Sequence, residues 1–554
     1  MDYAHLKADS LTLHIKDFVF AADSIGGTIA EGKFKEQSGF VLNKLETRFL
    51  YTGQQAYLHD LHLKTPGSDL KRSAAIQYAS LDALKNDIGN MQLDMDIENS
   101  KLLVKDILTF VPSLQSQPAF ADPNTTWYIN SRIKGRVADM QVNALQIQGL
   151  RDTKIDISGR LAGLPDMKNI NADIVIRDIS SSKRDIDLFV PAHTLPENIT
   201  LPARLSMSGH LKGNTATINT DISIRTDLGN ASVKGSFSQL TDPQKISYDA
   251  SVQTTALDLG TILQQKETLG PVTALLTVRG SGTDPKTARA VFDGKLQSAT
   301  IKQYNYHDLA IKGSIADQLV KVDAGIVDPN IHFALNAEAD LSKEYPSVVI
   351  NGMVDSIKTQ PLHLTSNTII YRGKIEADFP VTDPKNLQGK LFITESLLVR
   401  DGQRVKLDTV QLLAGSKDSG QYISIKSDIV NAELSGKYEL TALGNIFQQA
   451  IQPYFAVQPD SAIVHQPYDF RLNATIINSP ALKTFVPGLE RLDSVSLQSH
   501  FSDTQGWSAL LAAPVIDIGN NHIRRLQLQA GTGAAQDKID VNSHSSAIHK
   551  RHQY

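Results

Sequence analysis

Two histidines in this sequence have a spacing that can bind metal ions. His59 and His62 form a His-x-x-His pair, and on a helix this pair would present two imidazoles to one ion. The surrounding residues alternate between apolar and polar, which predicts a strand instead. On a strand, an offset of three residues sends two side chains to opposite faces. We therefore expect no shared metal ion at this pair.

An acidic row and a glycine-rich turn are the other candidates for chemistry. Asp94, Asp96 and Glu98 could bind calcium, but they lack the Asp/Asn-Gly loop of a known site, so a solvated strand face is favoured. Gly280-Ser281-Gly282 joins two predicted strands with no helix after it, which does not fit a phosphate loop. No serine-hydrolase, zinc-protease or Walker motif occurs. The sequence predicts no enzyme, and no catalytic, cofactor-binding or metal-binding residue.

Composition narrows the class of protein. The chain has 554 residues, 59 acidic and 55 basic side chains and a net charge of -4, which gives no reason to expect nucleic acid as a partner. It has no cysteine, which excludes disulfides and thiolate metal sites. No apolar run is long enough for a membrane helix, and no signal peptide opens the sequence. The chain is therefore expected either to stay in the cytoplasm or to be an internal piece of a longer exported protein.

Alternation of apolar and polar residues dominates the sequence and predicts strands throughout. The clearest stretch is 270–341, where four alternating runs are separated by turns such as Gly280 to Pro285. Helical spacing is confined to short patches at 102–111, 259–265, 443–451 and, interrupted by Pro487-Gly488, 481–492. The expected segments are 1–115, 116–265, 266–455 and 456–554, the last with a disordered tail from about Ser543.

About twenty strands with one apolar face each must hide those faces from water. Stacked sandwiches would need several domains with linkers, and a β-helix would need short regular coils. Neither pattern is visible. The predicted fold is therefore all-β, an elongated curved antiparallel sheet (a β-groove) with a hydrophobic trough and a few short helices. Each charged row would then lie on the outer wall.

The alternating runs, the Asp258-Leu259-Gly260 patch, the stretch Leu195 to Pro202 and the run from Tyr304 to Ile315 resemble the TamB and AsmA-like family of bacterial envelope proteins. The resemblance implies a periplasmic bridge that carries phospholipids along a β-groove between inner and outer membrane, for outer-membrane biogenesis. It also implies an outer-membrane barrel partner of the Omp85 type and an inner-membrane anchor. The regions that would make these two attachments are not recognisable, so a central fragment is expected.

The predicted lipid-facing positions are the apolar members of the best runs. They are Ile222, Ile224, Val233, Phe237, Val272, Ala274, Leu276, Val278, Phe292, Leu296, Leu309, Ile311, Ile315, Ile331, Phe333 and Leu335. Two other functions stay open. The family resemblance also permits a scaffold of the translocation and assembly module that helps insert outer-membrane proteins by β-augmentation. An adhesin or β-helical carbohydrate enzyme would need regular coils or paired carboxylates, which are not found.

Overall fold

The computed structural model describes residues 8–36, 40–188, 198–240, 242–400, 402–417, 420–448, 467–486, 488–532 and 539–549. These residues form an open, antiparallel, nearly all-β structure with few and short helices, which confirms the predicted fold class. The chain divides into two units. The first comprises 1–283 and 296–305, and the second comprises 284–295 and 306–554. The four predicted segments stay a prediction.

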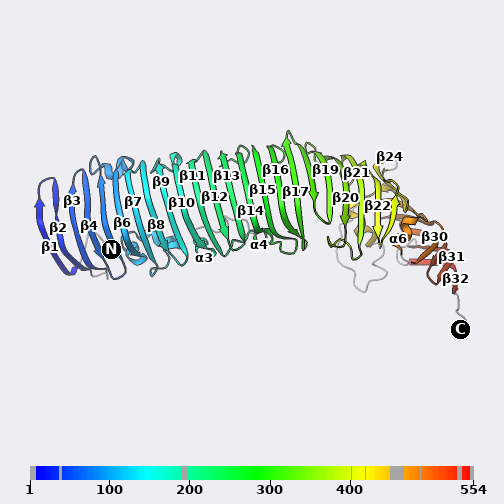
Figure 1. Ribbon diagram of the computed structural model, residues 1–554, viewed down its shortest axis with the longest axis horizontal. Coiled ribbons are helices and arrows are strands. Elements are labelled where there is room, and N and C mark those ends of the chain that lie inside the picture. Colours follow the sequence, from blue (N-terminus) through cyan, green and yellow to red (C-terminus); the bar gives the residue numbers. More distant parts are fainter. Residues whose placement is uncertain are drawn as a thin grey trace. The chain divides into compact units, whose positions relative to one another are not determined.

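Among the described residues of the first unit, fifteen strands pair in simple chain order, each with the one before it. At the usual spacing of about 4.8 Å between strands, they span about 65 Å. Figure 1 shows them side by side. They are β1 Ala8–Phe20, β2 Ser24–Glu36, β3 Val41–Thr52, β4 Gln55–Lys64, β5 Asp69–Gln77, β6 Gln92–Leu103, β7 Thr126–Arg136, β8 Asp139–Gly149, β9 Thr153–Ala162, β10 Asn171–Ser182, β11 Arg204–Asn214, β12 Thr217–Thr226, β13 Gly229–Ser238, β14 Ser247–Asp258 and β15 Leu269–Ser281.

In the second unit, strands β17 to β32 also pair with near neighbours, with small skips at β23 and β28. β16, Arg289–Ile301, contributes residues to both units. The others are β17 Tyr304–Ala316, β18 Leu319–Val327, β19 Ile331–Asp340, β20 Ser347–Lys358, β21 Ile369–Val381, β22 Gln388–Arg400, β23 Gln403–Leu407, β24 Val410–Lys417, β25 Gly420–Lys426, β26 Val430–Lys437, β27 Asp469–Ile476, β28 Leu489–Leu492, β29 Val495–Ser502, β30 Gly506–Ile518, β31 Asn521–Thr532 and β32 Ile539–His549.

The described part of the first unit has four α-helices, and three of them recur at a regular interval. α1 (Ala83–Asn86) lies between β5 and β6. α2 (Val104–Phe110) follows β6, α3 (Lys183–Ile186) follows β10 and α4 (Leu259–Ile262) follows β14, so these three are separated by four strands each. Strands four apart in an antiparallel order run the same way, so the three helices cap the same ends of the sheet, as α3 and α4 show in Figure 1. A structural repeat of four strands and a helix is thus present, although the sequence shows only a loose repeat.

Two carboxylates, the half-buried Asp106 and the buried Asp185, attach two of these helices to neighbouring turns. Asp106 in the first turn of α2 accepts hydrogen bonds of 2.5 Å from the hydroxyls of Thr65 and Ser68. Asp185 in α3 is 1% exposed and accepts from the backbone N–H of Asp152 at 2.8 Å. Each carboxylate satisfies polar groups that would otherwise be buried without partners, so these acids stabilise the capped ends.

Some predicted elements differ from the structure. The helix predicted over 481–492 is limited to α6, Pro480–Phe485, because the chain turns at Gly488 and continues as β28. Residues 543–549, in the predicted disordered tail, belong to β32 and pair with β31. Residues 189–197, 449–466 and 550–554 lie outside the described part.

Candidate functional site

The pairing register aligns the apolar side chains of the first unit into continuous rows. Because directly paired residues of an antiparallel sheet point to the same face, pairing apolar with apolar gives one apolar face. One row runs across six strands, through Ile176, Gly209, Ile222, Val233, Val252 and Leu276. The predicted positions Ile224, Phe237, Val272, Ala274 and Val278 lie on the same face, in neighbouring rows.

The second unit repeats this arrangement with its own row. It runs through Ile311, Ala324, Leu335, Gly352, Ile375 and Ile393. The predicted positions Leu309, Ile315, Ile331 and Phe333 lie on the same face. The predicted Phe292 and Leu296 lie on β16, and a Cβ atom at Gly313 would meet the Phe292 ring at 2.5 Å, so this ring covers the glycine. The structure brings the predicted residues of each unit onto one face.

Most of this apolar face is only half-buried. Of the sixteen predicted positions, fifteen are half-buried and Leu276 is 39% exposed, so none is fully buried. The chain exposes 33118 Å² in total. Even two separate compact proteins of half its mass would together expose only about 23,500 Å². The apolar face is therefore not filled by a second layer to the degree usual in a globular core.

A line of register shifts, here called the crease, crosses the sheet of the first unit. In successive strand pairs from β3 to β11 the register shifts at the same level, for example between Leu58 and Leu61 and between Ile97 and Ser100. Such bulges bend a strand and increase its twist. Apolar side chains along this line are buried, including Leu61 at 4% and Ile176 at 7% exposure. From this burial we infer that the sheet bends toward its apolar face along the crease.

The second unit has a corresponding crease in β19 to β21. Register shifts occur between His332 and Phe333 and between Val354 and Ile357, and Val354 is buried beside them. In each unit the described strands therefore form an apolar surface folded along its middle. Such a surface can hold a chain-like apolar ligand by contact alone, with no catalytic group.

The opposite face is polar and is connected by ion pairs between neighbouring strands. Lys134 Nζ lies 2.9 Å from Asp94, and Lys234 Nζ lies 2.7 Å from Asp221. The Asp221 carboxylate raises the pKa of the Lys234 ammonium above its ordinary value. These pairs are exposed, so each contributes little stability, but they suit a solvated outer wall.

The acidic row considered for calcium belongs to this outer face. Asp94 pairs with Lys134, Asp96 lies 3.2 Å from Arg132, and Glu98 pairs with Arg72. Each carboxylate thus faces a cation on a neighbouring strand. Within the described residues, no group of three or more His, Asp or Glu side chains is arranged to hold a metal ion.

The prediction that His59 and His62 point to opposite faces is wrong. Asp60 between them has a left-handed φ of 53° and forms a bulge, and the extra residue restores both imidazoles to one side. Both line an open depression of about 700 Å³ on the polar face, with Arg48 and Arg72 among its other lining residues. His62 Nε2 lies 3.0 Å from Asp69, and the His59 ring stacks on Tyr57.

Four aromatic residues at the starts of β7 and β17 occupy different environments. Trp127 is buried, and its ring stacks on Phe120 with centroids 6.0 Å apart. Its neighbour Tyr128 is 54% exposed on the other face of β7. Tyr304 and Tyr306 are half-buried at the start of β17. Trp127 is therefore part of the packing between β7 and the segment after α2.

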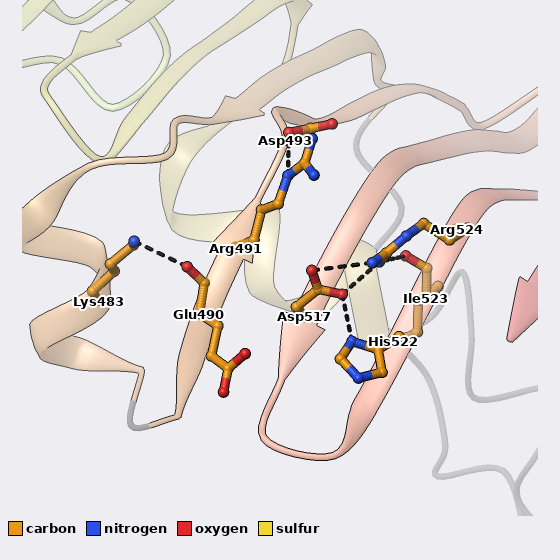
Figure 2. Close-up of polar contacts among 8 residues, drawn as sticks. All are labelled: Lys483, Glu490, Arg491, Asp493, Asp517, His522, Ile523 and Arg524. Atoms are coloured by element: carbon orange, nitrogen blue, oxygen red, sulfur yellow. Dashed lines mark hydrogen bonds and ion pairs between the residues drawn. The ribbon is translucent and has the colours of Figure 1, made fainter. Parts of the chain in front are cut away.

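A tight ionic cluster closes the hairpin between β30 and β31 (Figure 2). The Asp517 carboxylate accepts hydrogen bonds from Arg524 at 2.5 and 3.1 Å, and His522 Nδ1 lies 2.9 Å from it. The Arg524 guanidinium, followed by His522, holds the pKa of Asp517 below its ordinary value. Nearby, Lys483 donates to the Glu490 carbonyl at 3.0 Å, which links α6 to β28.

This cluster predicts a pH-dependent stability. A carboxyl with a lowered pKa stabilises the fold above its ordinary value of 3.8, and this contribution is lost as the pH falls through the lower folded value. We expect Asp517→Asn to lower the melting temperature at pH 7, and the difference from wild type to shrink toward pH 3. The control is Asp493→Asn, because Asp493 lies 3.6 Å from Arg491 in a looser pair. An equal loss at both pH values would contradict the prediction.

Among the described residues, no helix combines the length and apolar character needed to cross a membrane. Comparison of the chain with models of known protein families, with curated proteins and with solved structures gave no match. Function must therefore be inferred from the apolar face and its crease.

Proposed function

We propose that this chain carries phospholipids along its creased apolar face, as a segment of a TamB/AsmA-like periplasmic bridge between inner and outer membrane. The observation that supports it is the continuous, half-buried apolar row in each unit. Burial of one methylene is worth about 0.8 kcal/mol, so an acyl chain of about sixteen carbons has on the order of 13 kcal/mol to gain by leaving water. An aliphatic row offers this gain along its whole length.

The polar face supports the same proposal. A conduit for lipid needs one wet face toward the aqueous compartment and one apolar face toward the acyl chains, while the headgroup stays in water. The cross-strand ion pairs, such as Lys234 with Asp221, form the wet face. No residue of this path has to perform covalent chemistry, so the proposed protein is a carrier and not an enzyme.

Lipid bound to the purified chain is the direct test. We expect native mass spectrometry to find several phospholipids on each chain, and solvent extraction to release them. Nonionic detergent competes for the apolar face, so its addition should displace the bound phospholipids. A folded, lipid-free chain that also fails to take up lipid from vesicles would overturn the proposal.

An assembly scaffold is the second candidate, and one observation favours it. Among the described strands, β1 pairs with β2 alone, and it leaves Leu11 64% and Phe20 75% exposed. An unpaired strand edge of this kind can accept another strand by β-augmentation. A lipid-free chain that binds an alternating apolar, strand-forming peptide at this edge would favour the scaffold.

A further inference from the structure

An aromatic row lies on the apolar face of the second unit, near its C-terminal end. Phe470 on β27, Phe501 on β29 and Trp507 on β30 are consecutive register partners, so their side chains share a face. Their rings are stacked, with centroids 5.3 Å apart for Phe470 and Phe501 and 6.2 Å apart for Phe501 and Trp507. This row continues the apolar face of the unit with larger side chains.

The chain itself covers this row. Residues 443–448 are helical, and Phe447 sets its ring at 87° against both Phe470 and Phe501, with centroids 6.0 and 5.0 Å away. Ile446 of the same helix is buried in the cluster, and Phe470 is only 1% exposed. By contrast, none of the predicted lipid-facing positions is buried to this degree. Here the apolar face is occupied.

The covering segment is held at its start to the rim of the sheet. Tyr438 packs its ring on Phe470, and its carbonyl accepts a hydrogen bond from the side chain of Gln421 on β25. Leu440 then donates its backbone N–H to the Pro384 carbonyl at 3.1 Å, beside a Lys385–Glu439 ion pair of 3.8 Å. The segment thus turns from the end of β26 onto the apolar face.

We propose that residues 440–448 are a plug that closes the lipid path at β26 to β30. This proposal rests on the proposed lipid-carrier function. An acyl chain would need the surface that Phe447 and Ile446 already fill, and close-packed side chains leave no room for both. Acyl chains therefore reach the apolar faces of β22 and β24, around Ile393 and Leu412, and stop before Phe470 while the plug is seated.

Photocrosslinking tests the plug. The full chain is incubated with vesicles of phosphatidylcholine that carry a diazirine at the end of one acyl chain, illuminated, and mapped by mass spectrometry. In the wild type we expect label at Ile393 or Leu412 and none at Phe470 or Phe501. In Phe447→Ala, which removes both T-shaped contacts, label at Phe501 should appear and rise at least severalfold above background.

The control variant is Phe392→Ala, the same change on the polar face of β22, where Phe392 pairs with Glu376. It should leave Phe501 unlabelled. If Phe447→Ala shows no cooperative melting, Phe447→Leu replaces it, since leucine retains an apolar side chain without the ring contacts. Label at Phe501 in the wild type would contradict the plug proposal. So would a folded Phe447 variant that is labelled at Ile393 but not at Phe501. Absence of label at every apolar-face position would instead contradict the carrier function.

Discussion

Replacing Leu335 with aspartate should reduce the passage of lipid across β19 by about tenfold or more while leaving the chain folded. Leu335 lies in the middle of the apolar row of the second unit, between Ala324 and Gly352. An ionised carboxylate among apolar groups costs several kcal/mol when it has no partner. Since about 1.4 kcal/mol corresponds to a tenfold change in an equilibrium constant, lipid occupancy at this level should fall about tenfold or more. Ile311→Asp, two strands away in the same row, should act in the same way.

The measurement is transfer of a fluorescent phospholipid between donor and acceptor vesicles, together with lipid occupancy by native mass spectrometry. Ala334→Asp is the matched control, because it introduces the same carboxylate on the next residue of β19, where the side chain is exposed on the polar face. Transfer by Ala334→Asp should match the wild type. If folded Leu335→Asp carries lipid as well as Ala334→Asp does, the apolar row is not the path.

The sequence alone predicts which residues share the apolar face, for a simple physical reason. Side chains alternate along a strand, and short connections such as Asp227-Leu228 between β12 and β13 favour pairing of consecutive strands. Once Ile222 pairs with Val233, a shift by one residue would expose every apolar side chain, so the register follows from the pattern. Alternation in single strands is therefore enough to predict rows that cross many strands.

The crease and the plug could not be predicted in this way. A bulge depends on one extra residue relative to the partner strand, and nothing in the local pattern around Asp60 marks it. His59 and His62 were consequently assigned to opposite faces. Helical spacing did indicate the patch at 443–451, but its place on Phe470 and Phe501 results from contacts with strands distant in sequence. Tertiary packing decides both features.

The second large effect is expected at the crease, where Gly209→Ala should strongly destabilise the first unit. Gly209 has φ of 144°, which residues with a Cβ atom rarely adopt, and an added Cβ would lie 2.0 Å from the Asp221 carbonyl oxygen on β12. Both the backbone conformation and the contact must therefore change. Backbone strain of this kind and the displacement of a paired strand together should lower the free energy of unfolding by about 3 kcal/mol.

Urea denaturation measures this loss, and hydrogen exchange locates it. Exchange should increase first in β11 and β12, because the clash acts on their pairing. Gly159→Ala on β9, two strands away, should have the same effect, since an added Cβ would lie 2.0 Å from the Asp173 carbonyl oxygen. The control is Gly325→Ala, where the nearest atom, the Phe333 carbonyl oxygen, is at an ordinary 3.5 Å. Gly325→Ala should keep wild-type stability or gain about 0.5 kcal/mol from a less flexible unfolded chain. Equal stability of the Gly209→Ala and Gly325→Ala variants would mean that the bend at Gly209 is not needed to fold the apolar face along its crease.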